Sequence, residues 1–320
     1  MSHLNLASAK LGAQAVQCSD DSFASMDRLL QDHPAVWKED VYDDFGKWMD
    51  GWESKRRRSG GFDWCVIKLA VPGQIDRFTV DTSYFTGNYP PGAQVWGAIG
   101  DEQPSATSDR WVPLSDILSL QGDSQQDAQC LDKAGVYQWI RFDMYPDGGV
   151  ARLRVYGKAV VERSGDDSIE LSALVNGGRI TAYSDAHYGN VEAVLTAGRG
   201  TDMGDGWETK RRREPGNEWL IIELGVPGQI GEIEIDTAHF KGNFPGGFTI
   251  QAADMPALGD QAIVTQAMFW DEIVPFNALT ADSIHRFDVA PTGRVTHIKV
   301  NSIPDGGMSR IRAFGRPDHG

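Results

Sequence analysis

Residues 51–92 read GWESKRRRSGGFDWCVIKLAVPGQIDRFTVDTSYFTGNYPPG, and residues 206–247 read GWETKRRREPGNEWLIIELGVPGQIGEIEIDTAHFKGNFPGG. Aligned without a gap, 23 of the 42 positions are identical, which chance does not produce, so the chain contains a duplication. The match extends in both directions: residues 6–20 parallel 171–185, and residues 145–157 parallel 303–315.

Each copy spans about 150 residues, which is enough to enclose a hydrophobic core of its own. The junction falls in a short polar stretch, VERSGDD, at 161–167. We therefore predict a first domain at 1–160, a linker at 161–169 and a second domain at 170–320.

The repeated segments are short and rich in Val, Ile, Phe, Trp and Thr, and clusters of Gly, Pro and Asn separate them. This pattern is typical of an all-β protein. Alternating polar and apolar residues indicate half-buried strands. The predicted strands in the two copies are 64–69 and 219–224, 77–82 and 232–237, and 152–156 and 310–314.

Two other local structures are predicted. The sequence Val-Pro-Gly-Gln at 71–74 and 226–229 predicts a turn, because Pro presets φ and Gly tolerates positive φ. Short helices are expected at 22–30 and 112–120. The order of these segments resembles the galactose-binding-like jelly roll, so we predict two tandem jelly-roll β-sandwiches.

The net charge of −15 argues against nucleic acid and anionic membranes as partners. A small anionic substrate would then need a locally basic site. The three cysteines, Cys18, Cys65 and Cys130, form no zinc-binding pattern and suit a reducing compartment. The first residues lack the features of a signal peptide, so we expect a cytoplasmic protein.

Two long motifs, each present twice, carry a family resemblance. The first reads GKWMDGWESKRRR at 46–58 and MGDGWETKRRR at 203–213. The second reads DTSYFTGNYP at 81–90 and DTAHFKGNFP at 236–245. Together with SDAHYG at 184–189, they resemble the signature of the allantoicase family, and the resemblance covers nearly the whole chain.

The resemblance implies a hydrolase that acts on C–N bonds of linear amidines. Its reaction would convert allantoate and water into ureidoglycolate and urea, during the degradation of allantoin and purines. The resemblance also implies a homo-oligomer. One departure between the copies is that Arg141 and Asp143 of the first correspond to Lys299 and Asn301 of the second, so the copies are expected to differ in chemistry.

The chemistry of allantoate suggests roles for the repeated residues. A carboxylate is well bound by Arg, ureido groups need Asn, Thr or backbone partners, and the departing urea needs acid–base help. We therefore predict substrate binding by Lys210, Arg211, Arg213, Thr237, Asn243 and Arg310. The basic run could instead be a solvated edge or an ion-pair network between domains.

The acid–base candidates lie in the second copy. His239 and His187 stand where the first copy has Tyr84 and Ser22, and histidine changes charge near neutral pH. Asp236 and Glu208 are the accompanying carboxylates. Each His could equally be structural, and each repeated Asp could cap its own turn. The first-copy counterparts are Glu53, Lys55, Arg56, Asp81 and Asn88.

No metal site is predicted and no cofactor is required by the sequence, although Mn²⁺ or Zn²⁺ is compatible with it. Three other functions fit the same residues less well. They are a pair of non-catalytic carbohydrate-binding modules, a scaffolding protein, and a related enzyme that processes ureidoglycolate.

Overall fold

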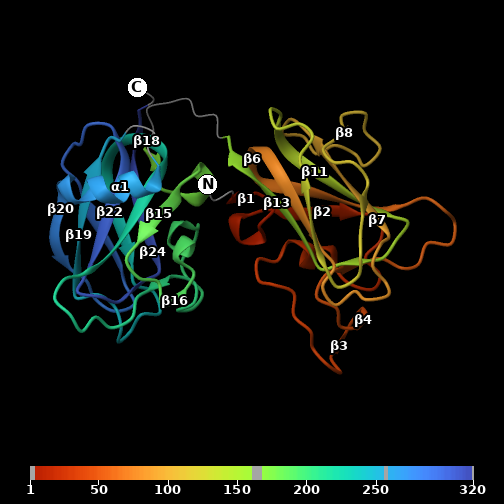
Figure 1. Cartoon of the computed structure of the whole chain (residues 1–320), viewed down its shortest axis with the longest axis horizontal. Coiled ribbons are helices and arrows are strands. Elements are labelled where there is room, and N and C mark those ends of the chain that lie inside the picture. Colours follow the sequence, from red (N-terminus) through yellow and green to blue (C-terminus); the bar gives the residue numbers. More distant parts are fainter. Residues whose placement is uncertain (1–3, 161–167, 256–258, 319–320) are drawn as a thin grey trace. The chain divides into compact units, whose positions relative to one another are not determined.

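The computed structural model describes residues 4–160, 168–255 and 259–318. The chain separates into two compact units, Met1–Val161 (unit 1) and Glu162–Gly320 (unit 2). Antiparallel strands are the main secondary structure of both units, so the prediction of two tandem all-β sandwiches is confirmed (Figure 1). Most of the predicted linker, residues 161–167, lies outside the described residues, and strand β14 begins at Ile169.

Unit 1 is a set of strands gathered around one long strand, β6. Its strands are β1 (Leu4–Asn5), β2 (Gln14–Cys18), β3 (Tyr42–Asp43), β4 (Gly46–Lys47), β5 (Trp52–Glu53), β6 (Asp63–Asp81), β7 (Gly92–Ala98), β8 (Val112–Pro113), β9 (Leu118–Ser119), β10 (Gln125–Gln129), β11 (Val136–Tyr145), β12 (Gly149–Val150) and β13 (Arg152–Ala159). Two 3-10 helices, η1 (Ala9–Leu11) and η2 (Met26–Leu30), lie between the first strands.

Unit 2 repeats this arrangement around β18. Its strands are β14 (Ile169–Glu170), β15 (Arg179–Tyr183), β16 (Tyr188–Gly189), β17 (Trp207–Glu208), β18 (Glu218–Asp236), β19 (Gly247–Ala253), β20 (Asp271–Ala278), β21 (Ile284–Asp288), β22 (Val295–Ile303), β23 (Gly307–Met308) and β24 (Arg310–Pro317). Its helices are η3 (Leu174–Asn176), η4 (Val191–Leu195), α1 (Asp260–Gln266) and η5 (Ala267–Phe269).

The long strand takes part in two groups of pairings. The first part of β6, at 63–68, pairs with β11 and β2, whereas the second part, at 73–81, pairs with β13 and β10. In unit 2, β18 pairs with β22 and β15 through its first part and with β24 and β21 through its second. One continuous segment therefore links the two layers of each sandwich.

The turn predicted at Val-Pro-Gly-Gln is wrong, because β6 and β18 continue through it. The pairing register of β11 with β6 shifts here, from Tyr137 opposite Gly73 to Trp139 opposite Lys68. A bulge of this kind leaves residues outside the hydrogen-bond ladder, so it accommodates Pro72, which has no N–H to donate. The Pro-Gly pair bends the strand instead of reversing it.

The predicted helices are only partly present. Of residues 22–30, only Met26–Leu30 is helical, and it is a 3-10 helix capped by Ser25. The helix predicted at 112–120 is wrong, since this segment forms β8 and β9. Pro113 has no N–H for a helical hydrogen bond, and strands at the edge of a sheet tolerate it.

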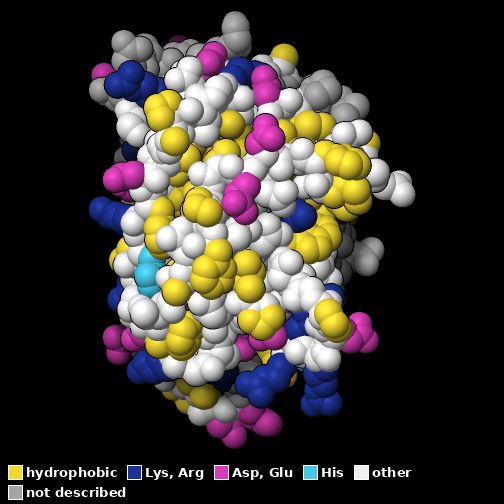
Figure 2. Space-filling view, turned by 90° about the vertical axis from the view of Figure 1, so that its left-hand side faces the viewer, with side chains coloured by type: hydrophobic (Ala, Val, Ile, Leu, Met, Phe, Trp, Pro, Cys, Tyr) yellow, Lys and Arg dark blue, Asp and Glu magenta, His cyan; other side chains and the backbone are white. Residues whose placement is uncertain are grey.

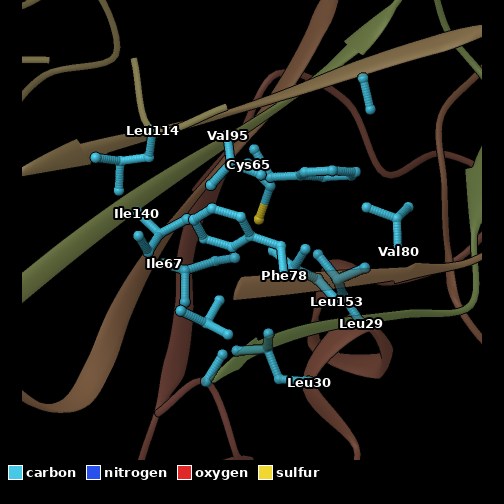
Figure 3. Packing of buried hydrophobic residues seen from close by; sticks show 14 of the residues in the cluster. Leu29, Leu30, Cys65, Ile67, Phe78, Val80, Val95, Leu114, Ile140 and Leu153 are labelled. Atoms are coloured by element: carbon cyan, nitrogen blue, oxygen red, sulfur yellow. The ribbon is translucent and has the colours of Figure 1, made fainter. Parts of the chain in front are cut away.

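Apolar side chains fill the space between the layers of each unit. In unit 1, Ile67 and Phe78 of β6, Val95, Ile140 and Leu153 come from four strands and converge in one fully buried cluster (Figure 3). A smaller cluster on the outer face of the sheet includes Trp111 and Trp139 in unit 1. In unit 2 the equivalent position is covered by Ile263 of α1 and by Trp270.

The surface is mixed in character. The face in Figure 2 carries hydrophobic side chains in small patches between polar and charged groups. The most exposed large hydrophobic residue is Tyr42 in unit 1 and Phe269 in unit 2, at 69% and 76%. Within the described ranges, no helix is long and apolar enough to cross a membrane.

Candidate functional site

The extended segment that contains β17 presents alternate residues to the surface of unit 2. Trp207 and Thr209 are buried, so Glu208 and Lys210 project from the opposite side of the segment. The Trp207 indole N–H donates to the carbonyl of Asp185 at 2.7 Å. The backbone N–H of Lys210 donates to Asp185 Oδ2 at 2.8 Å, and its Nζ lies 3.5 Å from Asp185 Oδ1.

The three arginines that follow have different environments. Arg212 is tied into the fold: its N–H donates to Asp305 Oδ2 at 2.8 Å, and its Nη1 donates to Glu218 Oε1 at 2.8 Å. Arg211 and Arg213 are exposed and form no ion pair with any residue that the structure describes. The alternation expected for an extended segment therefore leaves two guanidinium groups free to bind an anion.

These residues line a pocket of about 460 Å³. Its walls are Ser184, Asp185, Lys210, Arg211, Arg212, Arg213, Glu214 and Glu218. Asp185 and Glu218 are already paired with Lys210 and Arg212, so Glu214 is the one lining carboxylate that faces no cation within the described part of the chain. Because two arginines remain against one carboxylate, the pocket is locally basic in a chain of net charge −15.

Glu208, two residues before Lys210, belongs to a second group of polar residues. Its Oε1 accepts a hydrogen bond from Asn243 Nδ2, and this amide nitrogen lies 4.0 Å from Met203 Sδ. The backbone N–H of His187 donates to the carbonyl of Glu208 at 3.0 Å, and Tyr188 pairs with Glu208 between β16 and β17. The structure thus brings together three predicted site residues, His187, Glu208 and Asn243.

His239 lies on the same loop as Asn243 and is half-buried. Its backbone adopts a left-handed conformation, with φ of 68°, and its N–H donates to Asp282 Oδ1 at 3.0 Å. The ring nitrogen Nε2 lies 2.8 Å from the carbonyl oxygen of Gly200. His239 and Asn243 therefore both contact the segment 200–203.

Three other predicted residues are held inside the fold. Asp236 is fully buried, caps its own turn by accepting from Ala238 N at 2.8 Å, and accepts from Arg199 Nε at 3.1 Å. Thr237 is also buried and donates to the carbonyl of Thr280 at 2.6 Å. Arg310 is 1% exposed and pairs with Asp205 at 2.9 Å. These contacts show that all three side chains stabilise the loops around them. Their predicted roles in catalysis and substrate binding stay predictions.

Unit 1 preserves much of this arrangement. Lys55 contacts Asp20 as Lys210 contacts Asp185, through its N–H at 2.8 Å and its Nζ at 2.9 Å. Asn88 donates to Glu53 Oε1 at 2.5 Å. Burial raises the pKa of the Glu53 carboxyl above its ordinary value, and the hydrogen bond from Asn88 opposes this shift. The predicted counterparts in the first copy therefore lie in matching contacts.

The remaining counterparts differ in their surroundings. Arg56 is exposed, as Arg211 is. Asp81 caps its turn by accepting from Ser83 N at 2.8 Å, but it accepts its other hydrogen bond from Gln125 and not from an arginine. Tyr84 replaces His239 in the same left-handed conformation.

The expected difference between Asp143 and Asn301 lies within the sheets. Arg141 donates to both carboxylate oxygens of Asp143 at 2.9 Å, and its guanidinium stacks over Trp96 at 4.9 Å. Asn301 instead donates to Thr249 Oγ1 at 2.9 Å. Burial raises the pKa of Asp143, and Arg141 opposes the shift. The ion pair in unit 1 has become a neutral hydrogen bond in unit 2.

Sequence reasoning missed Arg199, Gly200 and Asp282, which surround His239. Arg199 and Gly200 fall where the copies cannot be aligned residue by residue, because residues 21–50 of the first copy correspond to only 186–205 in the second. The repeat therefore carried no signal for them. Among the described residues, no three His, Cys, Asp or Glu side chains come together in a way that could hold a metal ion.

Comparison with known proteins supports the resemblance. The family model described as the allantoicase repeat matches twice, at residues 4–160 and 169–318. A probable allantoicase of Photobacterium profundum is 49% identical over 318 residues, covering 98% of this chain and 96% of that protein. Probable allantoicase 1 of Burkholderia mallei is 48% identical, covering 99% and 95%.

A solved structure agrees with these matches. The crystal structure of allantoicase from Saccharomyces cerevisiae is 33% identical and superposes with a TM-score of 0.82, covering 98% of this chain and 92% of that one. Two long motifs repeated in order, a doubled family match and a shared fold over the whole length lead to one conclusion: the chain belongs to the allantoicase family.

Proposed function

We propose that this chain hydrolyses allantoate to ureidoglycolate and urea, and that the reaction takes place in unit 2. The observation that carries the proposal is the basic pocket, in which Arg211 and Arg213 form no ion pair with a described residue. The basic run that lines it begins two residues after Glu208, whose carboxylate accepts from the Asn243 amide, and together these are the groups that a small anion with ureido substituents needs.

The substrate carboxylate is bound by the guanidinium groups of Arg211 and Arg213. A planar guanidinium can donate two parallel hydrogen bonds to a carboxylate, which fixes orientation as well as position. Arg212 contributes indirectly, because its contacts with Asp305 and Glu218 hold the backbone of the run in its extended form.

We assign the ureido groups of the substrate to Glu208 and Asn243. A ureido group presents N–H donors and one carbonyl acceptor. The Glu208 carboxylate accepts from the N–H groups, and Asn243, already oriented by Glu208, completes the polar surface. Acid–base work falls to His239, with His187 as the second histidine close to Glu208.

No metal ion enters this scheme. The described side chains of the site offer His187 and His239 from separate loops, with no third ligand grouped beside either. The reaction needs only water, a base and a proton for the departing nitrogen, which His239, His187 and solvent can provide. The wider setting that we propose is allantoin degradation in the cytoplasm by a homo-oligomer.

The test is to incubate the purified chain with allantoate and to quantify urea, ureidoglycolate and ammonia directly. Equimolar urea and ureidoglycolate without ammonia is the expected result. Glu208→Gln should raise KM for allantoate about 10-fold or more, the effect of losing a charged hydrogen-bond acceptor for the ureido groups, while the matched change Glu53→Gln in unit 1 should raise it far less. Absence of turnover, even with Mn²⁺ or Zn²⁺ added, would refute the proposal.

A further inference from the structure

His239 is held in a conformation that costs free energy. A left-handed backbone is unfavourable for residues other than Gly. The equivalent residue of unit 1, Tyr84, has the same φ of 68° and therefore the same backbone strain. In both units an aspartate accepts from the strained N–H, Asp282 at 3.0 Å and Asp123 at 2.9 Å. A strained backbone that a hydrogen bond holds in place fixes the direction in which the side chain projects, and such strain is typical of functional sites.

The hydrogen bond from the ring of His239 defines its proton arrangement. A carbonyl oxygen can only accept, so the contact of 2.8 Å with Gly200 requires a proton on Nε2. In the neutral ring, Nδ1 then carries the lone pair. No described residue forms a hydrogen bond with Nδ1. This nitrogen is the part of the ring that remains free to accept a proton.

The Gly200 carbonyl is itself fixed. The guanidinium of Arg199 donates to the buried carboxylate of Asp236 at 3.1 Å and to the carbonyl of Asp282 at 3.1 Å. A Cβ on Gly200 would lie 2.0 Å from Ser309 Oγ, so the backbone is packed too closely for any other residue. Asp282 contacts both Arg199 and His239, which closes a ring of contacts around the imidazole.

The described residues of unit 1 do not form an equivalent set of contacts. The carboxylate of Asp81, which corresponds to Asp236, accepts from Gln125 Nε2 at 3.0 Å, and no hydrogen bond or ion pair joins it to an arginine among the described residues. The ring of Tyr84 packs near Trp37, with 6.1 Å between ring centroids. The backbone strain is common to both units, but the cation and the carbonyl that orient a ring are found in unit 2.

We propose that Arg199 and Gly200 are positioning residues that hold His239 with its proton on Nε2, so that Nδ1 is the atom that accepts a proton during hydrolysis. This rests on the proposed function. Nδ1 removes a proton from water as the water oxygen bonds to the central carbon of allantoate. The C–N electron pair leaves with the ureido nitrogen, which takes a proton from solvent and departs as urea. His239 then returns its proton to solvent.

The first test measures by NMR which nitrogen of the His239 ring carries the proton. The full chain is labelled with ¹⁵N-histidine, and the His239 resonances are assigned by their loss in His239→Gln. We expect the Nε2-protonated form in the wild type and a mixture of both forms in Arg199→Met. Protonation on Nδ1 in the wild type would overturn the proposal.

The second test measures kcat, KM and the pH profile of allantoate hydrolysis in variants. Gln at position 239 can keep a donor for Gly200 but has no atom equivalent to Nδ1, so His239→Gln should fold and lose at least 100-fold in kcat. Arg199→Lys and Arg199→Met should lower kcat about 10-fold and shift the acidic limb of the pH profile, with little change in KM. Gln125→Ala, the matched change beside Asp81, should leave kcat and the pH profile unchanged.

Arg199 variants that alter melting temperature but neither kcat nor the pH profile would overturn the positioning role. A wild-type chain with the Nε2-protonated ring and no turnover of allantoate would instead refute the proposed function and support the positioning of His239. The two failures are therefore distinguishable.

Discussion

Replacing Arg310 with Met separates a binding role from a structural one. The sequence predicts that Arg310 binds substrate, whereas the structure surrounds it with protein. It makes four hydrogen bonds, to the carbonyls of Gly198 at 3.1 Å, Asp205 at 2.8 Å and Ser309 at 2.6 Å, and to the Asp205 carboxylate at 2.9 Å. Only 1% of its surface is exposed.

The expected loss of stability follows from these contacts. Arg310→Met leaves the carboxylate of Asp205, which is 7% exposed, without its cation. Removing one partner of a buried ion pair costs about 3–5 kcal/mol. For a unit of this size, about 1 kcal/mol shifts the melting temperature by about 2–4 °C, so unit 2 should melt about 6–20 °C lower.

Calorimetry of the wild type and the variant measures this shift, and allantoate kinetics well below the melting range measure KM. Arg152→Met is the matched variant in unit 1, because Arg152 pairs with Asp50 at 2.7 Å with equally little exposure. Both variants should be destabilised and keep a normal KM. A variant at position 310 that melts within about 2 °C of the wild type while KM rises 10-fold would refute the reasoning.

Three further predictions follow from the same structure. Arg211→Ala should raise KM for allantoate about 10- to 100-fold with folding intact, the effect of losing about 1.5–3 kcal/mol of charged hydrogen bonding, and Arg56→Ala should raise it less. Burial raises the pKa of Glu170 from 4.5 to about 7, with Arg312 opposing the shift, so this group's contribution to stability is present below pH 4.5 and is lost as pH rises through 7. Glu170→Gln should therefore raise the melting temperature at pH 8 and not at pH 4.5, by an amount equivalent to at most about 3 kcal/mol, and an equal change at both pH values would contradict this. Prolonged dialysis against EDTA should leave kcat unchanged, and a loss that Mn²⁺ or Zn²⁺ restores would show that a metal is needed.

The sequence predicts the architecture well where both copies carry the same pattern of residues. The strand at 77–82 was recognisable because polar and apolar residues alternate there, and the strand at 64–69 because it is a short, largely apolar run, and both patterns are present in both copies. The Pro-Gly pair at 72–73 was misread, because local turn propensity does not reveal that neighbouring strands continue pairing on either side of it. Tertiary pairing overrides the local preference there.

The site was harder to predict. The exposed and buried arginines of the basic run could be distinguished by alternation, and the pairing of Glu208 with Asn243 joins residues that were both selected. The substrate-binding role predicted for Arg310 stays a prediction, and the sequence does not show that Asp205, far away in the chain, pairs with it. The role of Arg199 could not be predicted for a related reason, because its ion-pair partner Asp236 lies far from it in the sequence.

The long strand that passes through both layers has a consequence for how each unit folds during synthesis. Strand β6 needs β13, whose residues lie about 70–85 positions later in the chain, before its second part is paired on both sides. Contacts between such distant residues form late and slowly. Neither layer can therefore mature before nearly the whole unit has left the ribosome, and the first unit can complete its folding while the second is still being translated.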